Sequence, residues 1–152
     1  MSVLTQGAQE GFNSQVVINY NDLTETSSGV AETVSCFTIP KDAYIDSVAY
    51  YLVEAFDGGS ISSVVFELGD EDDADGFIFA SEIEITAVSS AINSGAYYND
   101  GTTANSVNGK TYDNTTTKSV IARFLPTGDA LTALTTGKLI IKANIIDLSK
   151  II

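Results

Sequence analysis

The chain has 152 residues, a length that suits one domain with a substantial core. Its hydrophobic content of 44% excludes a chain that is disordered throughout. The 20 acidic and 7 basic residues give a net charge of −13, and the basic residues are scattered along the sequence. Because no basic cluster forms, neither a nucleic-acid backbone nor an anionic membrane surface is an expected partner.

Residues 1–13 contain Gly7 and Gly11 among small and polar side chains, and they predict a flexible N-terminal arm. Residues 14–152 are expected to form a single β-sandwich domain. The first residues show no signal-peptide pattern, and no stretch approaches the roughly 18 apolar residues of a membrane span. The single cysteine, Cys36, allows no intramolecular disulfide. We therefore expect a soluble protein that folds in a reducing cytoplasm.

Runs of β-branched and aromatic residues alternate with turn signals along the rest of the chain. In the run at residues 30–39, Val34 and Cys36 are expected on one face, with Phe37 and Ile39 on the other. No helix of normal length fits between the runs. The pattern predicts an all-β fold, an antiparallel β-sandwich or jelly roll, with a barrel as the alternative. The expected strands are residues 16–20, 30–39, 44–56, 62–68, 83–88, 119–125 and 138–148.

Residues 93–117 are the most polar segment and predict a long exposed loop with at most one short hairpin. The loop carries Tyr97, Tyr98 and Tyr112. Aromatic side chains on a loop can stack on sugar faces, which would suit a carbohydrate-binding module. They can also pack the loop back onto its own domain, and we favour this second interpretation because tyrosine is an amphipathic anchor.

The sequence shows no catalytic machinery. It has no histidine, which excludes Ser-His-Asp triads, Cys-His pairs and the usual zinc-binding sets. Nucleophile elbows, phosphate-binding loops and dinucleotide fingerprints are also missing. No catalytic or cofactor-binding residue is therefore predicted, and we do not expect an enzyme. Cys36 is interpreted as a small apolar core residue rather than a reactive thiol.

One acidic segment has the spacing of a calcium loop. In residues 71–82, three acids would take the first ligand positions, a glycine the sharp turn and a last glutamate the bidentate position: Glu71, Asp73, Asp75, Gly76 and Glu82. A glutamate in the first position and strand-like flanks argue against calcium. A solvated acidic turn is the favoured interpretation, and calcium at the Glu71–Glu82 loop is the alternative. No cofactor is expected, and the metal ligands stay undetermined.

Three groups of residues together resemble a known class of proteins. They are residues 37–45 with 53–59, which include Ala55-Phe56-Asp57-Gly58-Gly59, then residues 68–77, and finally residues 131–141. These segments resemble the small β-sandwich virion proteins of tailed bacteriophages. The resemblance implies a virion structural protein without enzymatic activity, made in the host cytoplasm.

Within that class, the resemblance favours a capsid decoration (cement) protein on the outer capsid surface. Its expected partners are the major capsid protein or other virion proteins, and the expected assembly is a homo-oligomer, with a trimer favoured. A virion protein of the tail, neck or fibre is the first alternative. The second is a carbohydrate- or calcium-binding β-module.

Overall fold

The computed structural model describes residues 11–79, 85–86, 90–92, 94–98, 109–113 and 116–150. The helical elements of these described residues are single-turn 3-10 helices, which connect or follow the strands: η1 (Tyr20–Asp22), η3 (Leu131–Ala133) and η4 (Leu148–Lys150). No helix in this part of the chain is long and apolar enough to cross a membrane. The strands are β1 (Ser14–Asn19), β2 (Glu32–Ile39), β3 (Ala43–Asp57), β4 (Ser63–Gly69), β5 (Ser90–Ile92), β6 (Lys110–Tyr112), β7 (Lys118–Thr127) and β8 (Thr136–Asp147).

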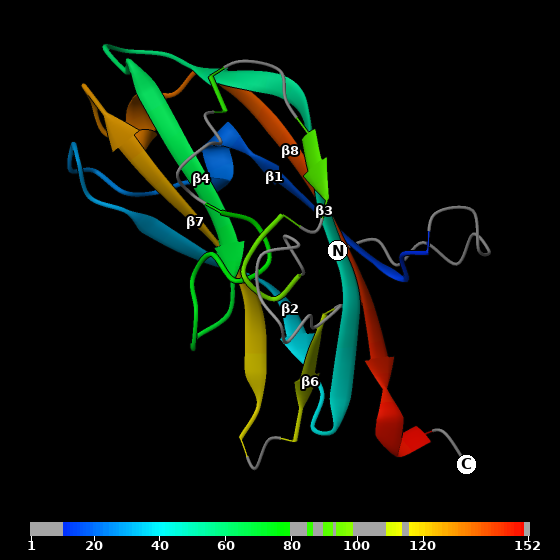
Figure 1. The fold of residues 1–152 in the computed structure, drawn as a ribbon. Helices are drawn as coiled ribbons and strands as arrows, with labels where there is room; N and C mark the ends of the chain where they lie inside the picture. The colour runs from blue at the N-terminus through cyan, green and yellow to red at the C-terminus, as the bar shows by residue number, and fades with distance from the viewer. Residues whose placement is uncertain are drawn as a thin grey trace.

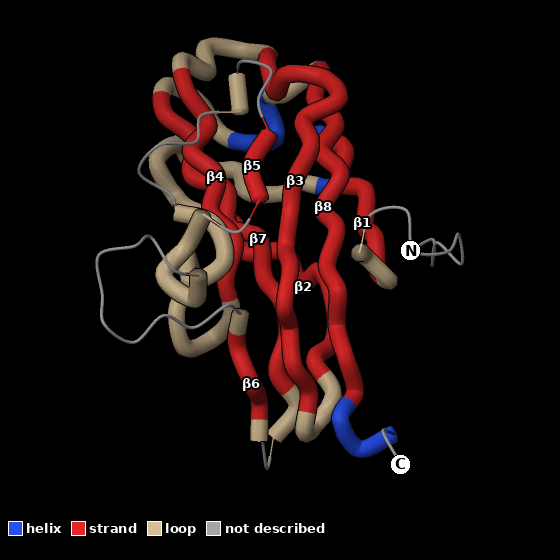
Figure 2. The backbone as a smooth tube through the Cα atoms, turned by 45° about the vertical axis from the view of Figure 1, so that its right-hand side comes forward, coloured by secondary structure: helices blue, strands red, loops and turns tan. Residues whose placement is uncertain are grey.

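The strands form two antiparallel sheets that face each other (Figures 1 and 2). One sheet has the order β1-β8-β3-β5, with β6 also paired to β3, and the other has the order β2-β7-β4. The pairings are nested: β1 pairs with β8, β2 with β7, and β3 with β5 and β6. Nested antiparallel pairing across two sheets is the jelly-roll arrangement. The predicted all-β sandwich is confirmed.

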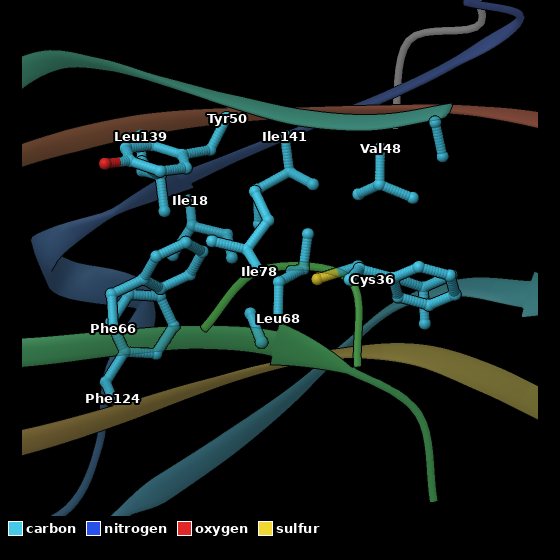
Figure 3. Packing of buried hydrophobic residues seen from close by; sticks show 14 of the residues in the cluster. Ile18, Cys36, Val48, Tyr50, Phe66, Leu68, Ile78, Phe124, Leu139 and Ile141 are labelled. Atoms are coloured by element: carbon cyan, nitrogen blue, oxygen red, sulfur yellow. The ribbon is translucent and has the colours of Figure 1, made fainter. Parts of the chain in front are cut away.

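The core fills the space between the two sheets (Figure 3). Tyr50 of the first sheet meets Phe66 of the second edge-on, with ring centroids 5.1 Å apart. Phe66 in turn packs against Phe124, with centroids 5.4 Å apart. Such aromatic pairs stabilise a core beyond the area they bury. Cys36 is buried in the same cluster, which confirms its interpretation as a core residue.

A β-bulge in β2 changes the faces predicted for this strand. The register against β7 shifts between Ser35 and Phe37, so the residue between them is extra. Cys36 and the following Phe37 are therefore both buried, although simple alternation placed them on opposite faces. A bulge resets the period of 2 because two residues of one strand oppose one of the other. The sequence-based assignment of faces was wrong at this point.

The predicted strand at residues 83–88 lies mostly outside the described residues. Ile85 and Thr86 form a turn rather than a strand. The Ile85 N–H donates to the Val64 carbonyl at 3.0 Å, and the Ile85 carbonyl accepts from the Phe56 N–H at 2.9 Å. Because Val64 is in β4 and Phe56 in β3, this residue joins the two sheets at one edge of the sandwich.

Residues 1–10 of the predicted arm also lie outside the described residues. At its far end, Asn13 is held by β8: its N–H donates to Ala143 at 3.2 Å, and its side-chain amide donates to Ile145 at 2.7 Å. The Asn13 side-chain oxygen also accepts from the Ile145 N–H at 3.0 Å. The chain is therefore tied to the sheet one residue before β1 begins.

Candidate functional site

The most elaborate polar cluster of the described residues is centred on Asp70, the residue that follows β4. Its Oδ1 accepts hydrogen bonds from the N–H groups of Asp72 and Asp73, at 2.9 and 3.0 Å. The Asp70 N–H donates in turn to the Asp73 carbonyl at 2.9 Å. This is the local pattern by which an aspartate stabilises a tight turn. The turn also needs Gly69, because a Cβ there would lie 1.9 Å from the Asp73 carbonyl oxygen.

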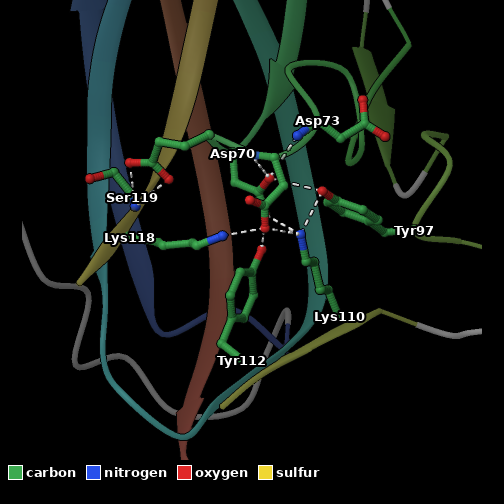
Figure 4. Close-up of polar contacts among 9 residues, drawn as sticks. Asp70, Asp73, Tyr97, Lys110, Tyr112, Lys118 and Ser119 are labelled. Carbon is green, nitrogen blue, oxygen red and sulfur yellow. Dashed lines mark hydrogen bonds and ion pairs between the residues drawn. The ribbon is translucent and has the colours of Figure 1, made fainter. Parts of the chain in front are cut away.

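Three side chains from distant parts of the sequence converge on the same carboxylate (Figure 4). The Tyr97 hydroxyl donates to Oδ1 at 2.8 Å, and the Tyr112 hydroxyl donates to Oδ2 at 2.5 Å. The Lys110 ammonium lies 2.7 Å from Oδ2. The Asp70 side chain has no solvent exposure, and the Lys110 side chain is 19% exposed. Asp70 therefore accepts from five protein donors and ties the turn to β6 and to residues 94–98.

The charge state of this cluster follows from its contacts. Burial by itself raises the pKa of the Asp70 carboxyl, but hydrogen bonds from Lys110, Tyr112, Tyr97 and the Asp73 N–H outweigh burial and hold that pKa below its ordinary value. Burial raises the pKa of Tyr97 and of Tyr112, and the ionised Asp70 raises both further. At neutral pH the cluster thus holds an ionised carboxylate and two protonated hydroxyls.

Lys110 also packs against the aromatic rings that surround it. Its Nζ lies 4.1 Å from the centroid of the Tyr97 ring and 5.0 Å from that of Tyr112. It contacts Asp72 at 3.2 Å, and Lys118 pairs with the same Asp72 carboxylate. Two of the seven basic residues are thus concentrated at this acidic turn, where they offset repulsion among its carboxylates.

The residues that have the spacing of a calcium loop make other contacts in this structure. Both carboxylate oxygens of Glu71 accept from the Ser119 N–H at 3.0 Å, which turns this side chain toward β7. Asp73 lies close to Asp75; burial raises the pKa of Asp73, and the neighbouring Asp75 raises it further. Glu82 lies outside the described residues. Within the part of the chain that the structure describes, no three acidic or cysteine side chains lie close enough together to hold a metal ion.

The three tyrosines that the sequence singled out pack against their own domain, as the favoured interpretation predicted. Tyr98 and Tyr112 are buried, at 8% and 2% exposure. Tyr97 is half-buried and meets Phe77 edge-on, with centroids 5.1 Å apart. Residues 94–98 form no strand, as predicted, and Ser94 and Ala96 are exposed. The prediction of an exposed loop was wrong for Tyr98, which is buried, and for β6, which joins the sheet through β3. Residues 99–108 of that loop lie outside the described residues.

Sequence reasoning treated the acids of this turn as solvated and missed the pairing of Asp70 with Lys110. One signal was available. Lys110 and Tyr112 are two residues apart, so in a strand they lie on one face, which suits a lysine and a tyrosine that share one buried carboxylate. Chemically, the cluster holds segments of the fold together: the described donors already occupy both oxygens of Asp70.

Comparison with known proteins gives a likeness at the level of fold. No protein-family model matches the chain, and no curated protein matches its sequence. The structure is similar to a chain of the cyanophage Pam1 capsid asymmetric unit, with a TM-score of 0.52 and 16% sequence identity. The match covers 94% of this chain and 91% of that chain. At this identity the likeness shows a shared β-sandwich fold.

Proposed function

We propose that this chain is a structural protein of a phage virion, and specifically a capsid decoration (cement) protein on the outer surface of the head shell. The observation that carries the proposal is the likeness of fold to a chain of a cyanophage capsid asymmetric unit, which extends over 94% of the chain. A fold does not by itself fix a function. The proposal therefore also draws on the resemblance to small virion proteins, which lies in residues 37–45, 53–59, 68–70, 73–77 and 131–141.

The polar cluster supports a structural role. Asp70, Lys110, Tyr97 and Tyr112 satisfy one another and hold three segments in place. The net charge of −13 suits the outside of a shell, because an acidic surface is repelled by packaged DNA. Partners in this role are the major capsid protein and further copies of the chain. A trimer is the arrangement that the resemblance favours, and synthesis in the host cytoplasm and the lack of enzymatic activity are parts of the same proposal.

Copy number tests the decoration role. In purified particles of the virus that encodes the chain, quantitative gel densitometry against the major capsid protein should show hundreds of copies, because a decoration protein follows the symmetry of the shell. About a dozen copies or fewer would instead identify a neck, tail or fibre protein, since those positions repeat few times. Absence of the chain from purified particles would refute both versions of the proposal.

Add-back of purified chain to particles that lack it then tests how the chain attaches. We expect the full chain to restore occupancy, and a variant without residues 1–10 to bind less if the arm clasps the shell. This deletion leaves the hydrogen bonds of Asn13 to β8 in place. Unchanged occupancy of the shortened chain would refute the arm as the clasp.

A carbohydrate-binding module is not favoured by the positions of the tyrosines. Sugar stacking needs exposed ring faces, whereas Tyr98 and Tyr112 are buried and the Tyr97 hydroxyl is bound to Asp70. A glycan array should therefore give no hits with the purified chain, and a reproducible hit that is lost in Tyr97→Ala would revive this alternative.

A further inference from the structure

Strand β1 forms one edge of the five-stranded sheet (Figure 2). Among the described residues it pairs only with β8, and the register between the two runs from Ser14 to Asn19 without a shift. Natural edge strands are usually blunted by a charged side chain, a proline or a bulge, because their free N–H and C=O groups can pair with another chain. β1 has none of these devices, and within the described part of the chain no strand pairs with its outer edge.

The electrostatics of this edge are unusual for the chain. No charged residue occurs between Glu10 and Asp22, although the chain as a whole carries a net charge of −13. The Asp22 carboxylate is held within its own chain, because it accepts from the Asn19 N–H at 2.8 Å and from the Asn19 side chain at 3.2 Å. Two copies of so acidic a protein repel each other over most of their surface. They can approach closely where the surface carries no acidic charge, and β1 is such a place, because it has no charged residue and its neighbours Lys138 and Lys142 in β8 are basic.

The outer face beside this edge carries one apolar row, flanked by Lys138 and Lys142 of β8, which lie opposite Asn19 and Gln15. Val17 of β1 lies opposite Ile140 of β8, which lies opposite Tyr51 of β3, so the three residues form one row across the sheet. Val17 is 36% exposed and Tyr51 is 55% exposed. In the neighbouring row Gln15 lies opposite Lys142, and these two residues, with Phe12, help to line a groove of about 390 Å³. The apolar row of Tyr51, Ile140 and Val17 therefore ends at the outer edge of β1.

We propose that β1 pairs antiparallel with β1 of a second copy, with Val17 on the two-fold axis. Residues directly opposite in a sheet point to the same face. With Val17 opposite its own symmetry mate, Gln15 lies opposite Asn19 of the second copy and Val16 lies opposite Ile18. Amide therefore meets amide and apolar side chain meets apolar side chain, so the strand is complementary to itself, as a two-fold interface requires.

The pairing has two structural consequences. The sheets of the two copies become one continuous sheet, and the row of Tyr51, Ile140 and Val17 continues into the same row of the second copy. A contact made by one short strand from each copy is small, so the dimer is weak in dilute solution and strengthens with concentration. Raising the salt concentration should strengthen it further, because salt screens the repulsion between acidic copies.

The inference concerns the purified chain and can fail or hold independently of the virion role. The test is sedimentation of the chain over a range of concentrations. The wild-type mass should rise from 16.0 kDa toward twice that value. Val17→Lys places two ammonium groups opposite each other and should weaken association at least about tenfold. The matched control is Val53→Lys: Val53 lies in β3 of the same sheet, is 43% exposed and is away from the edge, so association should be unchanged.

Thermal unfolding of both variants checks that they fold. Val17→Cys supplies a second measurement if Val17→Lys does not fold, because Cys36 is buried and leaves position 17 as the reactive thiol. Under oxidation, Val17→Cys should form a covalent dimer at least about tenfold faster than Val53→Cys, since only the first pair meets across the axis. A wild-type chain that stays monomeric at about 1 mM, a three-copy assembly insensitive to Val17→Lys, or equal cross-linking of the two cysteine variants would each overturn the inference.

Discussion

The Lys110 Nζ lies 2.7 Å from the Asp70 Oδ2, although 40 residues separate the two in sequence. Asp70 directly follows β4 of one sheet, and Lys110 begins β6, which pairs with β3 of the other sheet. The ion pair therefore joins the two layers at one end of the sandwich. Tyr112, also in β6, donates to the same oxygen at 2.5 Å and strengthens the same connection.

Removal of the central carboxylate should be strongly destabilising. Asp70→Ala leaves the Tyr97 and Tyr112 hydroxyls and the Lys110 ammonium without their shared acceptor. Loss of one partner of a buried ion pair costs about 3–5 kcal/mol, so we expect the free energy of unfolding to fall by about that amount. Urea unfolding followed by tyrosine fluorescence measures the change.

The matched control for this variant is Asp72→Ala. Asp72 carries the same charge in the same turn and pairs with Lys110 and Lys118, but its side chain is 52% exposed. Exposed ion pairs contribute little because water screens them. The control should unfold close to the wild-type midpoint. Equal losses in the two variants would show that net charge at the turn matters and that the buried contacts of Asp70 do not.

The same carboxylate predicts how stability depends on pH. The folded protein holds the pKa of Asp70 below its ordinary value of 3.8. The contribution of Asp70 is therefore fully present above that ordinary pKa and is lost as the pH falls through the lower pKa of the folded carboxyl. Urea midpoints measured from pH 7 down to about pH 2 should fall more steeply for wild type than for Asp70→Asn. Parallel curves would contradict a lowered pKa for this group.

Gly76 keeps Tyr97 in reach of Asp70. A Cβ at position 76 would lie 2.3 Å from the Tyr97 ring, so Gly76→Ala must push the ring away. Overpacking of this kind typically costs about 1–3 kcal/mol. In the Tyr97→Ala background, Gly76→Ala should cost less than it does in the wild-type chain, because the obstructing ring is gone. Additive losses in urea unfolding would argue against the steric cause.

Cys36 should be inert in the folded protein. Burial raises the pKa of the Cys36 thiol to about 12, from an ordinary value of 9.0. The thiolate is the reactive form, so native protein at pH 8 should react with a disulfide reagent such as Ellman's at a rate limited by transient opening. Unfolded protein should react at once. A fast native reaction that is complete in seconds would contradict both the burial and the raised pKa.

The sequence predicted the strands well where hydrophobic runs are long and turn residues bound them. Asp57-Gly58-Gly59 ends β3 as expected. Gly58 has a φ of +149°, and a Cβ there would lie 2.5 Å from the Thr135 backbone nitrogen, so the turn requires glycine. β7 continues two residues beyond its predicted end at residue 125, through Thr127. Pro126 in this extension lies opposite Val64 of β4, near the end of the sheet.

The features that sequence reasoning missed depend on contacts between distant residues. The bulge at Cys36 arises from the pairing of β2 with β7, and the sequence of β2 alone does not predict it. The burial of Asp70 depends on Lys110 and Tyr112, which lie in a segment whose polar composition predicts an exposed loop. The local composition of a segment predicts only the average exposure of its side chains. A buried carboxylate is stable only when other parts of the fold supply its hydrogen-bond donors.

Calcium should not bind to the acidic turn with appreciable affinity. A calcium site needs six or more oxygen ligands that are free to turn toward one ion. Here the Glu71 oxygens accept from the Ser119 N–H, so ligation of calcium by Glu71 would have to break contacts that already stabilise the fold. Lys110 and Lys118 also lie at the Asp72 carboxylate beside the candidate ligands, where their positive charges oppose the binding of a cation. Calorimetric titration of the chain with calcium should give only the heat of dilution, and a chelator should leave the unfolding temperature unchanged.

The control for that titration is Lys118→Ala, which removes one of the lysines paired with Asp72. If the lysines oppose the binding of a cation at this turn, Lys118→Ala should gain calcium affinity relative to wild type, since it removes one positive charge beside the acidic side chains. Saturable heat in the wild-type chain that Glu71→Gln abolishes would instead establish the calcium loop that the spacing of residues 71–82 suggests.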